Sequence, residues 1–316
     1  MIDKGLGLIV AFALLAVALA AEAQPAGTVR TIGIIGHTPA DSFEASLREL
    51  GWVAGNNVRF ERRVSTDPTK LTLFAAELAR IPVDVIFAGN ALATRVAAAA
   101  TGVIPIITVS ADPVKAGAAS SLARPGANVT GFAITHPMGK RLEMLVEALP
   151  TARRVAFLTN PTNPNTVEFR REAEAVARAK GVKLLSFEVS APEQIESVIA
   201  TVAKARPDAF VAAGDPLFWT THQRLIEAVA RHRLPTMWES GTWVEAGGLM
   251  AYGANPDDLY RRAATYADRI LKGTKPTDLP IDQATKFDLT INLKTARTLD
   301  ITISPPVLLR ADHVVQ

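Results

Sequence analysis

Short apolar runs alternate with longer amphipathic stretches along most of the chain. Many of the runs are rich in Val and Ile and nearly continuous, as in strands buried on both faces. The runs that predict strands cover residues 31–36, 58–64, 83–88, 104–109, 129–134, 155–159, 183–189, 209–213 and 234–238. The stretches that predict helices cover residues 42–50, 71–80, 91–100, 113–122, 139–149, 166–180, 194–205 and 222–231. This alternation predicts an α/β protein with parallel sheets and right-handed crossovers.

The strand pattern occurs twice. The segments that begin at residues 30, 58, 84 and 104 match those that begin at 153, 182, 208 and 234, with offsets of 123, 124, 124 and 130 residues. A nearly constant offset indicates two lobes of one architecture, each a doubly wound parallel sheet. Two such lobes in tandem form a cleft, and a cleft between lobes is a common place to bind a small molecule.

Segments between and after the two repeats predict a hinge of several strands. Residues 135–139 follow the last strand of the first repeat and are the predicted first crossover. Residues 257–271 predict a long helix, and residues 287–293 predict a strand with one exposed face. The predicted parts are a signal peptide (1–23), lobe 1 (28–136 plus 254–284) and lobe 2 (137–253 plus 285–316).

The N-terminus predicts export. Residues 5–21 are apolar apart from glycines and end in Ala21-Glu22-Ala23, whose small residues fit a signal-peptide cleavage site. An uncleaved anchor is the alternative, although the stretch is short for a membrane span. The chain has no Cys, which excludes lipoprotein attachment and disulfides. Its formal charge of +3 is spread along the chain without a Lys/Arg run, so no nucleic-acid partner is expected.

Signatures of catalysis are missing from the sequence. It contains no G-x-S-x-G elbow and no Walker A motif, and its five His residues lack H-E-x-x-H spacing. We therefore expect a binding protein with no catalytic residues, no cofactor and no metal site.

Polar residues follow the predicted strands where a ligand of an open parallel sheet would bind. Thr38, Asp112, Asn160 and Asp215 each follow a strand and precede a proline. Such a pair opens a helix, whose free N–H groups favour an anion such as a carboxylate. The alternative for each is a helix cap with no ligand role.

The candidate ligand contacts are the residues at these strand ends and at the first crossover. Asp112 or Asp215 can pair with a ligand amine, and Trp238 can stack on a flat ligand, although Phe218 and Trp219 can equally pack in the core. An acid without an amine fits the same loops if the two Asp residues only cap helices. The candidates are His37, Thr38, Asn90, Ala91, Ser110, Asp112, Thr135, Asn160, Thr162, Asn163, Asn165, Asp215, Trp238 and Glu239.

Several longer motifs carry a family resemblance that runs from about residue 30 to the C-terminus. They lie at residues 47–55, 111–114, 121–131, 139–143, 244–250 and 285–296. With these motifs the chain resembles ABC-transporter substrate-binding proteins related to tryptophan and tyrosine binders. The resemblance implies a type I periplasmic-binding-protein fold, a periplasmic location and delivery of a ligand to an ABC permease in the inner membrane. An amino acid or a related carboxylate, aromatic among others, is the expected ligand.

Three other functions use the same architecture. A periplasmic sensor subunit would present its ligand to a receptor, and an exported enzyme would turn the ligand over. A repressor core shares the fold, but the predicted signal peptide and the lack of a DNA-binding helical head argue against it. We expect a monomer, because a protein that closes on its ligand and docks on a permease needs freedom to move.

Overall fold

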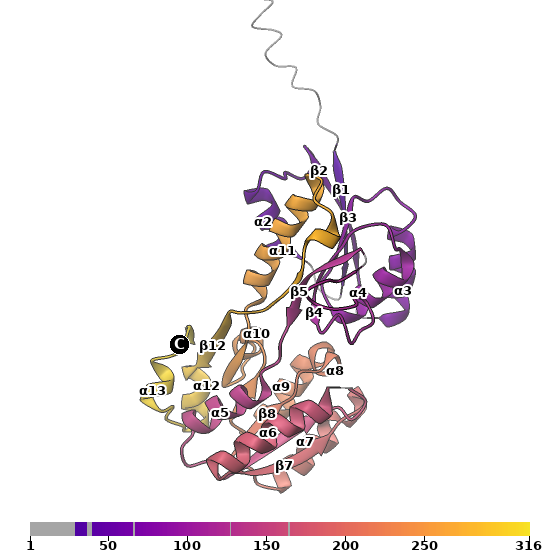
Figure 1. Cartoon of the computed structure of the whole chain (residues 1–316). Coiled ribbons are helices and arrows are strands. Elements are labelled where there is room, and N and C mark those ends of the chain that lie inside the picture. The colour runs from indigo at the N-terminus through magenta and orange to yellow at the C-terminus, as the bar shows by residue number, and fades with distance from the viewer. Residues whose placement is uncertain (1–28, 37–39, 66, 127, 164) are drawn as a thin grey trace, which may run out of the picture.

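The chain folds into two α/β units joined by crossovers (Figure 1). The structure is a computed structural model that describes residues 29–36, 40–65, 67–126, 128–163 and 165–316. The predicted signal peptide lies outside the described residues. None of the helices in the described ranges is long and apolar enough to cross a membrane.

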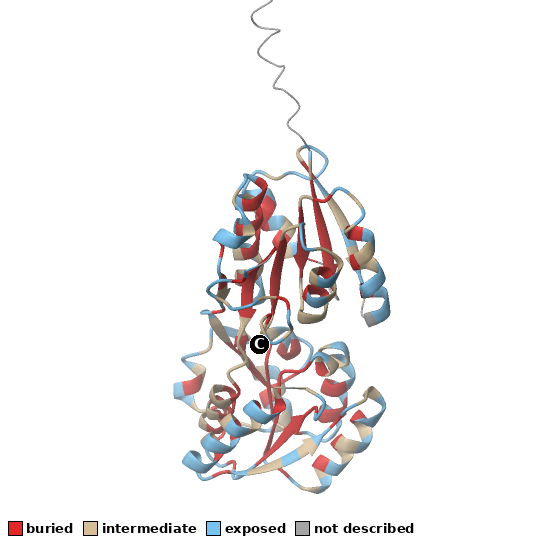
Figure 2. Ribbon diagram, turned by 45° about the vertical axis from the view of Figure 1, so that its right-hand side comes forward, coloured by how far each residue is buried: buried red, intermediate tan, exposed pale blue. Residues whose placement is uncertain are grey.

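Lobe 1 is built on a fully parallel sheet with strand order β11-β5-β4-β3-β1-β2. Its strands are β1 (Arg30–Gly36), β2 (Val58–Val64), β3 (Val85–Ala88), β4 (Ile106–Ala111), β5 (Val129–Ile134) and β11 (Ile281–Gln283). Two helices cover each face, so the inner strands are largely buried, as Figure 2 shows. These helices are α2 (Asp41–Glu49) with α11 (Pro256–Leu271), and α3 (Pro68–Leu78) with α4 (Ala91–Ala100). The short 3-10 helix η2 (Pro276–Asp278) precedes β11.

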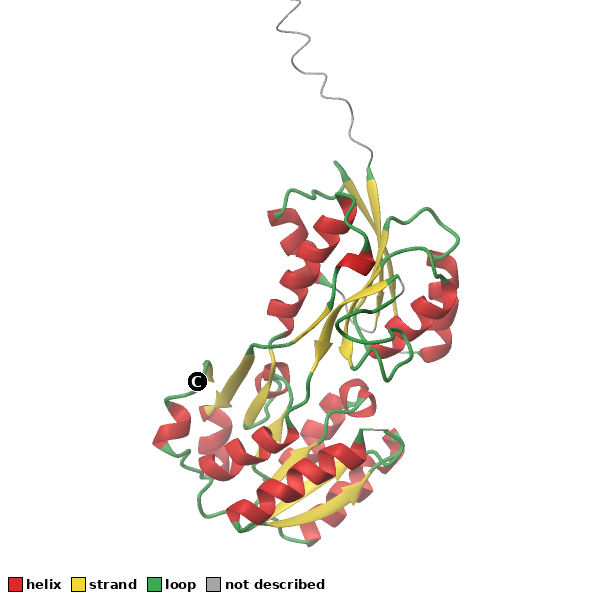
Figure 3. Cartoon of the chain, in the orientation of Figure 1, coloured by secondary structure: helices red, strands yellow, loops and turns green. Residues whose placement is uncertain are grey.

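Lobe 2 is built on a mixed sheet with order β13-β12-β10-β9-β8-β6-β7, in which only the β10–β12 pair is antiparallel. Its strands are β6 (Arg154–Thr159), β7 (Lys183–Glu188), β8 (Ala209–Ala212), β9 (Thr236–Trp238), β10 (Met250–Ala254), β12 (Phe287–Asn292) and β13 (His313–Val315). Helices pack on both faces (Figure 3). They are α5 (Met138–Ala148), α6 (Thr166–Lys180), η1 (Pro192–Gln194), α7 (Ile195–Lys204), α8 (Pro216–Thr220), α9 (His222–Arg231), α10 (Gly241–Glu245), α12 (Leu293–Leu299) and α13 (Pro305–Leu308).

The predicted repeat is present in the strand order. The strands run β4-β3-β1-β2 in lobe 1 and β9-β8-β6-β7 in lobe 2, which is the same order in each repeat. The nine predicted strands are confirmed, with ends within two residues of those expected. The predicted fold class, two largely parallel α/β lobes, is therefore confirmed.

The chain passes between the lobes three times. Residues 135–137 form the first crossover, from β5 to α5. Asn255 forms the second, from β10 to α11, and residues 284–286 form the third, from β11 to β12. Each lobe therefore combines early and late parts of the sequence. This agrees with the prediction of a hinge in which the chain crosses between the lobes several times. The residue boundaries given for the lobes stay a prediction.

One predicted helix is wrong. Residues 113–122 form turns instead, because Asp112 has a positive φ of 34° and Gly117 one of 73°, which interrupt a helical path. The Asp112 side chain accepts a hydrogen bond from the Lys115 N–H at 3.0 Å and so closes a tight turn after β4.

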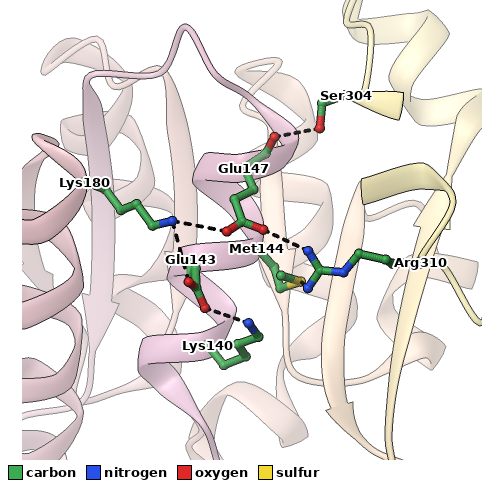
Figure 4. A network of polar contacts seen from close by, with 7 residues as sticks. All are labelled: Lys140, Glu143, Met144, Glu147, Lys180, Ser304 and Arg310. Carbon is green, nitrogen blue, oxygen red and sulfur yellow. Dashed lines mark hydrogen bonds and ion pairs between the residues drawn. The ribbon is translucent and has the colours of Figure 1, made fainter. Parts of the chain in front are cut away.

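The C-terminal segment is fixed to α5 by a polar network (Figure 4). The Glu147 carboxylate lies 3.1 Å from Lys180 Nζ on α6 and 3.0 Å from an Arg310 nitrogen. The Ser304 hydroxyl donates to the Glu147 main-chain oxygen at 2.7 Å. These contacts hold the last residues of the chain against lobe 2.

Candidate ligand-binding site

A cavity of about 320 Å³ lies between the lobes beside the first crossover. Of the predicted ligand contacts, Asp112, Thr135 and Asn165 line it. The remaining lining residues combine apolar and charged side chains: Ala111, Lys115, Leu122, Ala133, Ile134, His136, Pro137, Glu168, Phe169, Glu172 and Gln283. Its size and mixed lining are those of a small-molecule site.

Lys115 connects the two lobes across this cavity. Its Nζ donates to Asn165 Oδ1 at 3.1 Å and lies 3.3 Å from Glu168 Oε2, both in lobe 2. Asp112 Oδ2, in lobe 1, is 3.5 Å away. Partial burial acts to lower the pKa of Lys115, but hydrogen bonds and charges from Glu168 and Asp112 outweigh it and raise that pKa. Lys115 therefore stays charged and contacts both sides of the cavity.

A second cluster surrounds Asp215, which follows β8 and is 3% exposed. Asn160 Nδ2 donates to its Oδ1 at 3.1 Å, and Asn163 Nδ2 donates to its Oδ2 at 2.7 Å. The Leu217 N–H at the start of α8 also donates to Oδ1, at 2.8 Å. Burial raises the pKa of Asp215, while the hydrogen bonds from Asn163, Asn160 and Leu217 act to lower it. The structure thus brings three predicted residues together from two strand ends.

The loop after β6 is held by its own side chains. Asn160 Oδ1 accepts hydrogen bonds from the N–H and the hydroxyl of Thr162, at 3.0 and 2.8 Å. Asn163 Oδ1 accepts from the N–H of Asn165 at 2.9 Å. The helix predicted over residues 166–180 begins at Thr166 as expected, so the Asn160-Pro161 pair opens these turns and not a helix. Their hydrogen bonds fix the two amides that contact Asp215.

Several of the predicted ligand contacts of lobe 1 lie at the N-terminus of α4 and at the end of β4. Asn90 caps α4, since its Oδ1 accepts from the Ala93 N–H at 2.8 Å. Buried hydroxyls of Thr94, Thr108 and Ser110 form a chain, with oxygens 2.6 and 2.8 Å apart. Ala91 is the half-buried first residue of α4. His37 and Thr38 lie outside the described residues.

Trp238 and Glu239 lie inside lobe 2. Trp238 is 1% exposed and packs on Phe210 and Trp243, with ring centroids 5.5 and 5.0 Å apart. In this buried position the Trp238 ring packs on core side chains and does not present a face on which a ligand could stack. The Glu239 side chain is 4% exposed, and its Oε2 lies 2.9 Å from His136 Nδ1.

Sequence reasoning did not select Lys115, His136, Arg141 or Glu168 as site residues. His136 follows β5 on the first crossover, which is the same strand-end signal that selected its neighbour Thr135. Arg141 lies within an amphipathic helix, where an arginine normally faces solvent, yet its side chain is fully buried. No local pattern identifies such a residue.

Asp215 and the start of α4 are not among the residues that line the cavity, but each offers groups for a small polar molecule. The buried Asp215 carboxylate can accept hydrogen bonds from an ammonium group, and the start of α4 with nearby hydroxyls suits a carboxylate. In the part of the chain that the structure describes, no group of three or more His, Asp or Glu side chains is placed to hold a metal ion.

The chain matches known proteins over most of its length. Residues 37–315 match a family model described as ABC transporter substrate binding protein. The tyrosine-binding protein of Clostridioides difficile (strain R20291) is 24% identical over 262 residues, covering 82% of this chain and 75% of that protein.

Two solved structures show the same fold. One is described as the ABC domain in complex with L-Trp from Streptococcus pneumonia, with a TM-score of 0.79, 24% identity and coverage of 90% of this chain and 100% of that one. The other is a ligand-free, open substrate-binding protein with adhesive properties from Clostridium difficile, with a TM-score of 0.70, 23% identity and coverage of 91% and 100%.

Proposed function

Because the chain belongs to the family of ABC transporter substrate-binding proteins, a family of binders and not of enzymes, we propose that it captures an amino acid between its lobes and delivers it to an ABC importer. The observation that carries this proposal is Asp215, a buried carboxylate held by two amides and one N–H at a strand end. A carboxylate with a raised pKa gains most from a cationic partner, and an ammonium group supplies one.

The carboxylate of the ligand is assigned to lobe 1. The N-terminus of α4, capped by Asn90, carries free backbone N–H groups and a partial positive charge. Ser110 and Thr108 add hydroxyls at the end of the neighbouring strand. Two opposite charges on one ligand, each recognised by a different lobe, would draw the lobes together when the ligand binds.

An aromatic side chain is our first candidate for the rest of the ligand. The interlobe cavity has room for one, and Leu122, Ile134, Pro137 and Phe169 give it apolar lining. Related proteins are described as a tyrosine-binding protein and as a complex with L-Trp, which supports the same choice.

We further propose that the protein works in the periplasm as a monomer, after export by the signal peptide of residues 1–23. Closure of the lobes around the ligand would remove water and strengthen the polar contacts. The closed form would then present both lobes to the permease in the inner membrane.

Calorimetric titration of the protein without residues 1–23 tests the proposal. The panel is L-tryptophan, L-tyrosine, L-phenylalanine and L-leucine, with indole-3-propionate as the acid that lacks the amine and tryptamine as the amine that lacks the acid. We expect an aromatic amino acid to bind at least about tenfold more tightly than either truncated analogue, a difference of about 1.4 kcal/mol. Equal affinity for indole-3-propionate would remove Asp215 from ligand recognition, and no binding across the panel would contradict an amino-acid ligand.

A further inference from the structure

Glu239 lies where four segments of the protein meet. Its Oε2 is 2.9 Å from His136 Nδ1 on the first crossover and 3.7 Å from an Arg141 nitrogen on α5. Trp219, on α8, also acts on this carboxylate and lowers its pKa. The Arg141 guanidinium also donates to the main-chain oxygen of Ala212, the last residue of β8, at 3.2 Å.

Two glycines allow neighbouring segments of the main chain to approach Glu239 closely. Gly214 lies against its side chain, and Gly253 lies against its main chain. A Cβ at Gly214 would lie 2.6 Å from Glu239 Oε2 and 2.8 Å from His136 Nδ1. At Gly253, in β10, a Cβ would clash with the main-chain oxygen of Glu239. Gly214 directly precedes Asp215, so the main chain that carries Asp215 rests on the His136–Glu239 contact.

The charges around Glu239 keep it ionised despite its burial. Burial acts to raise the pKa of Glu239, but the nearby His136, Arg141 and Trp219 outweigh it and lower that pKa. The carboxylate is therefore an anion whose partners come from a crossover and from two helices, and its position depends on all of them.

We propose that Glu239 is a positioning residue, which sets the position of the Gly214–Asp215 segment and couples it to the first crossover through His136. This inference rests on the proposed function, because Asp215 is the group that it positions for the ligand. When the crossover moves during lobe closure, His136 moves with it, and Glu239 transmits that movement to the strand end that carries Asp215.

Four variants test this role. Glu239→Gln keeps the shape and removes the charge, His136→Gln removes the partner, and the double variant removes both. Trp219→Phe removes an indole N–H that acts on the carboxylate and leaves the carboxylate in place, which covers the case that Glu239→Gln does not fold. The matched control is Glu188→Gln, since Glu188 is an exposed residue of β7 that pairs with Arg170.

The first measurement needs no ligand. Hydrogen exchange of the Ala213 and Leu217 amides, which bond to Leu158 and Asp215, reports the order of the segment. We expect exchange at least about fivefold faster in Glu239→Gln, His136→Gln and Trp219→Phe than in the control, as for a loss of about 1 kcal/mol. Unchanged exchange at both amides would overturn the positioning role, whether or not an amino acid binds.

The second measurement is affinity for the amino acid that binds the unmodified protein most tightly. We expect Glu239→Gln and His136→Gln each to weaken binding about tenfold and the double variant to weaken it no more than either alone, because the two residues act as a unit. If the variants melt at a lower temperature but their affinity stays within twofold of the unmodified protein, Glu239 has a structural role only. The same holds if the losses of affinity in the two single variants add up fully in the double variant. If the unmodified protein binds no amino acid, the proposed function is contradicted instead. Failure of the proposed function can therefore be told apart from failure of the positioning role.

Discussion

Asp84 and Asp208, 124 positions apart in the sequence, make the same hydrogen bond in the two lobes. Asp84 Oδ2 accepts from the Thr31 N–H at 2.7 Å, and Asp208 Oδ2 accepts from the Arg154 N–H at 2.8 Å. Each of the two Asp residues directly precedes the third strand of its repeat. Its carboxylate thus fixes the start of the first strand of the same repeat. The resemblance between the two halves extends to single side-chain contacts and not only to strand order.

This shared contact predicts matched losses of stability. Asp84→Asn and Asp208→Asn should each lower the free energy of unfolding by about 1 kcal/mol, because a charge-assisted hydrogen bond becomes a neutral one at a partly exposed site. Urea unfolding of the two variants and the unmodified protein measures this. Midpoints equal to that of the unmodified protein would show that the repeated contact carries no stability.

Asp215→Asn should separate ligand affinity from folding. The amide keeps the size of the side chain but cannot pair with an ammonium group, so affinity for an amino acid should fall by about tenfold or more. Affinity for an acid that lacks the amine should change little. Calorimetric titration of the unmodified protein and Asp215→Asn with both ligands tests these two expectations. An equal loss of affinity for the amino acid and for the acid without an amine would contradict recognition of the amine by Asp215.

The raised pKa of Asp215 predicts how stability varies with pH. A carboxyl group with a higher pKa in the folded state than in the unfolded state costs stability when both states are ionised. The unmodified protein should therefore lose stability relative to Asp215→Asn as pH rises from the unfolded value of about 3.9 through the folded pKa. Thermal melting of the two proteins across that range gives the difference, and a difference that stays constant would refute the expectation.

Lys115→Met should loosen the contact between the lobes. The substitution keeps much of the side-chain length and removes the bonds to Asn165 and Glu168. Partly exposed ion pairs contribute at most about 1 kcal/mol, so we expect the ligand-free protein to open and its affinity to change by no more than about fivefold. Small-angle X-ray scattering reports the opening, and an unchanged radius of gyration would mean that Lys115 does not hold the lobes.

Tyr266 should ionise only at high pH. Burial, together with the charge and hydrogen bond of Asp282, raises the pKa of Tyr266 to about 12, although Arg262 and Arg269 oppose this. Since the unfolded value is about 10, its contribution to stability is lost as pH rises above 10. Ultraviolet titration of the unmodified protein and Tyr266→Phe should differ only in the step near the highest pH, and a difference at lower pH would contradict this assignment.

The fold could be predicted from the sequence because the inner strands of its sheets are buried on both faces. Such strands require nearly continuous apolar runs, which identified the inner strands of the two repeats, whereas the edge strands β2 and β7 are mostly exposed or partly buried. The stretch 113–122 was misleading, since small residues and one apolar face resemble a helix while Asp112 and Gly117 turn the chain. A positive φ at an aspartate leaves no mark in a single sequence.

The candidate site could be predicted only in part. The strand-end rule located Asn160, Asn163 and Asp215, which the structure brings together. It placed Trp238 at a ligand although that side chain packs in the core, because the rule gives a position along the strand and not the direction of the side chain. Arg141 was missed because its partner Glu239 is far away in sequence, and such a pair has no local signature.

The threading of the chain through both lobes determines the order in which the protein can fold during synthesis. The helix α11 supplies much of the apolar cover of lobe 1, and β11 is an edge strand of its sheet. Strands β12 and β13 complete lobe 2, and Arg310 fixes the last segment against α5. Lobe 1 lacks its whole core until α11 and β11 have been made, and lobe 2 lacks its own until the last segment has been made, so neither lobe can complete its fold early in synthesis. A chain that stays open until it is complete is suited to passage through a narrow translocation channel.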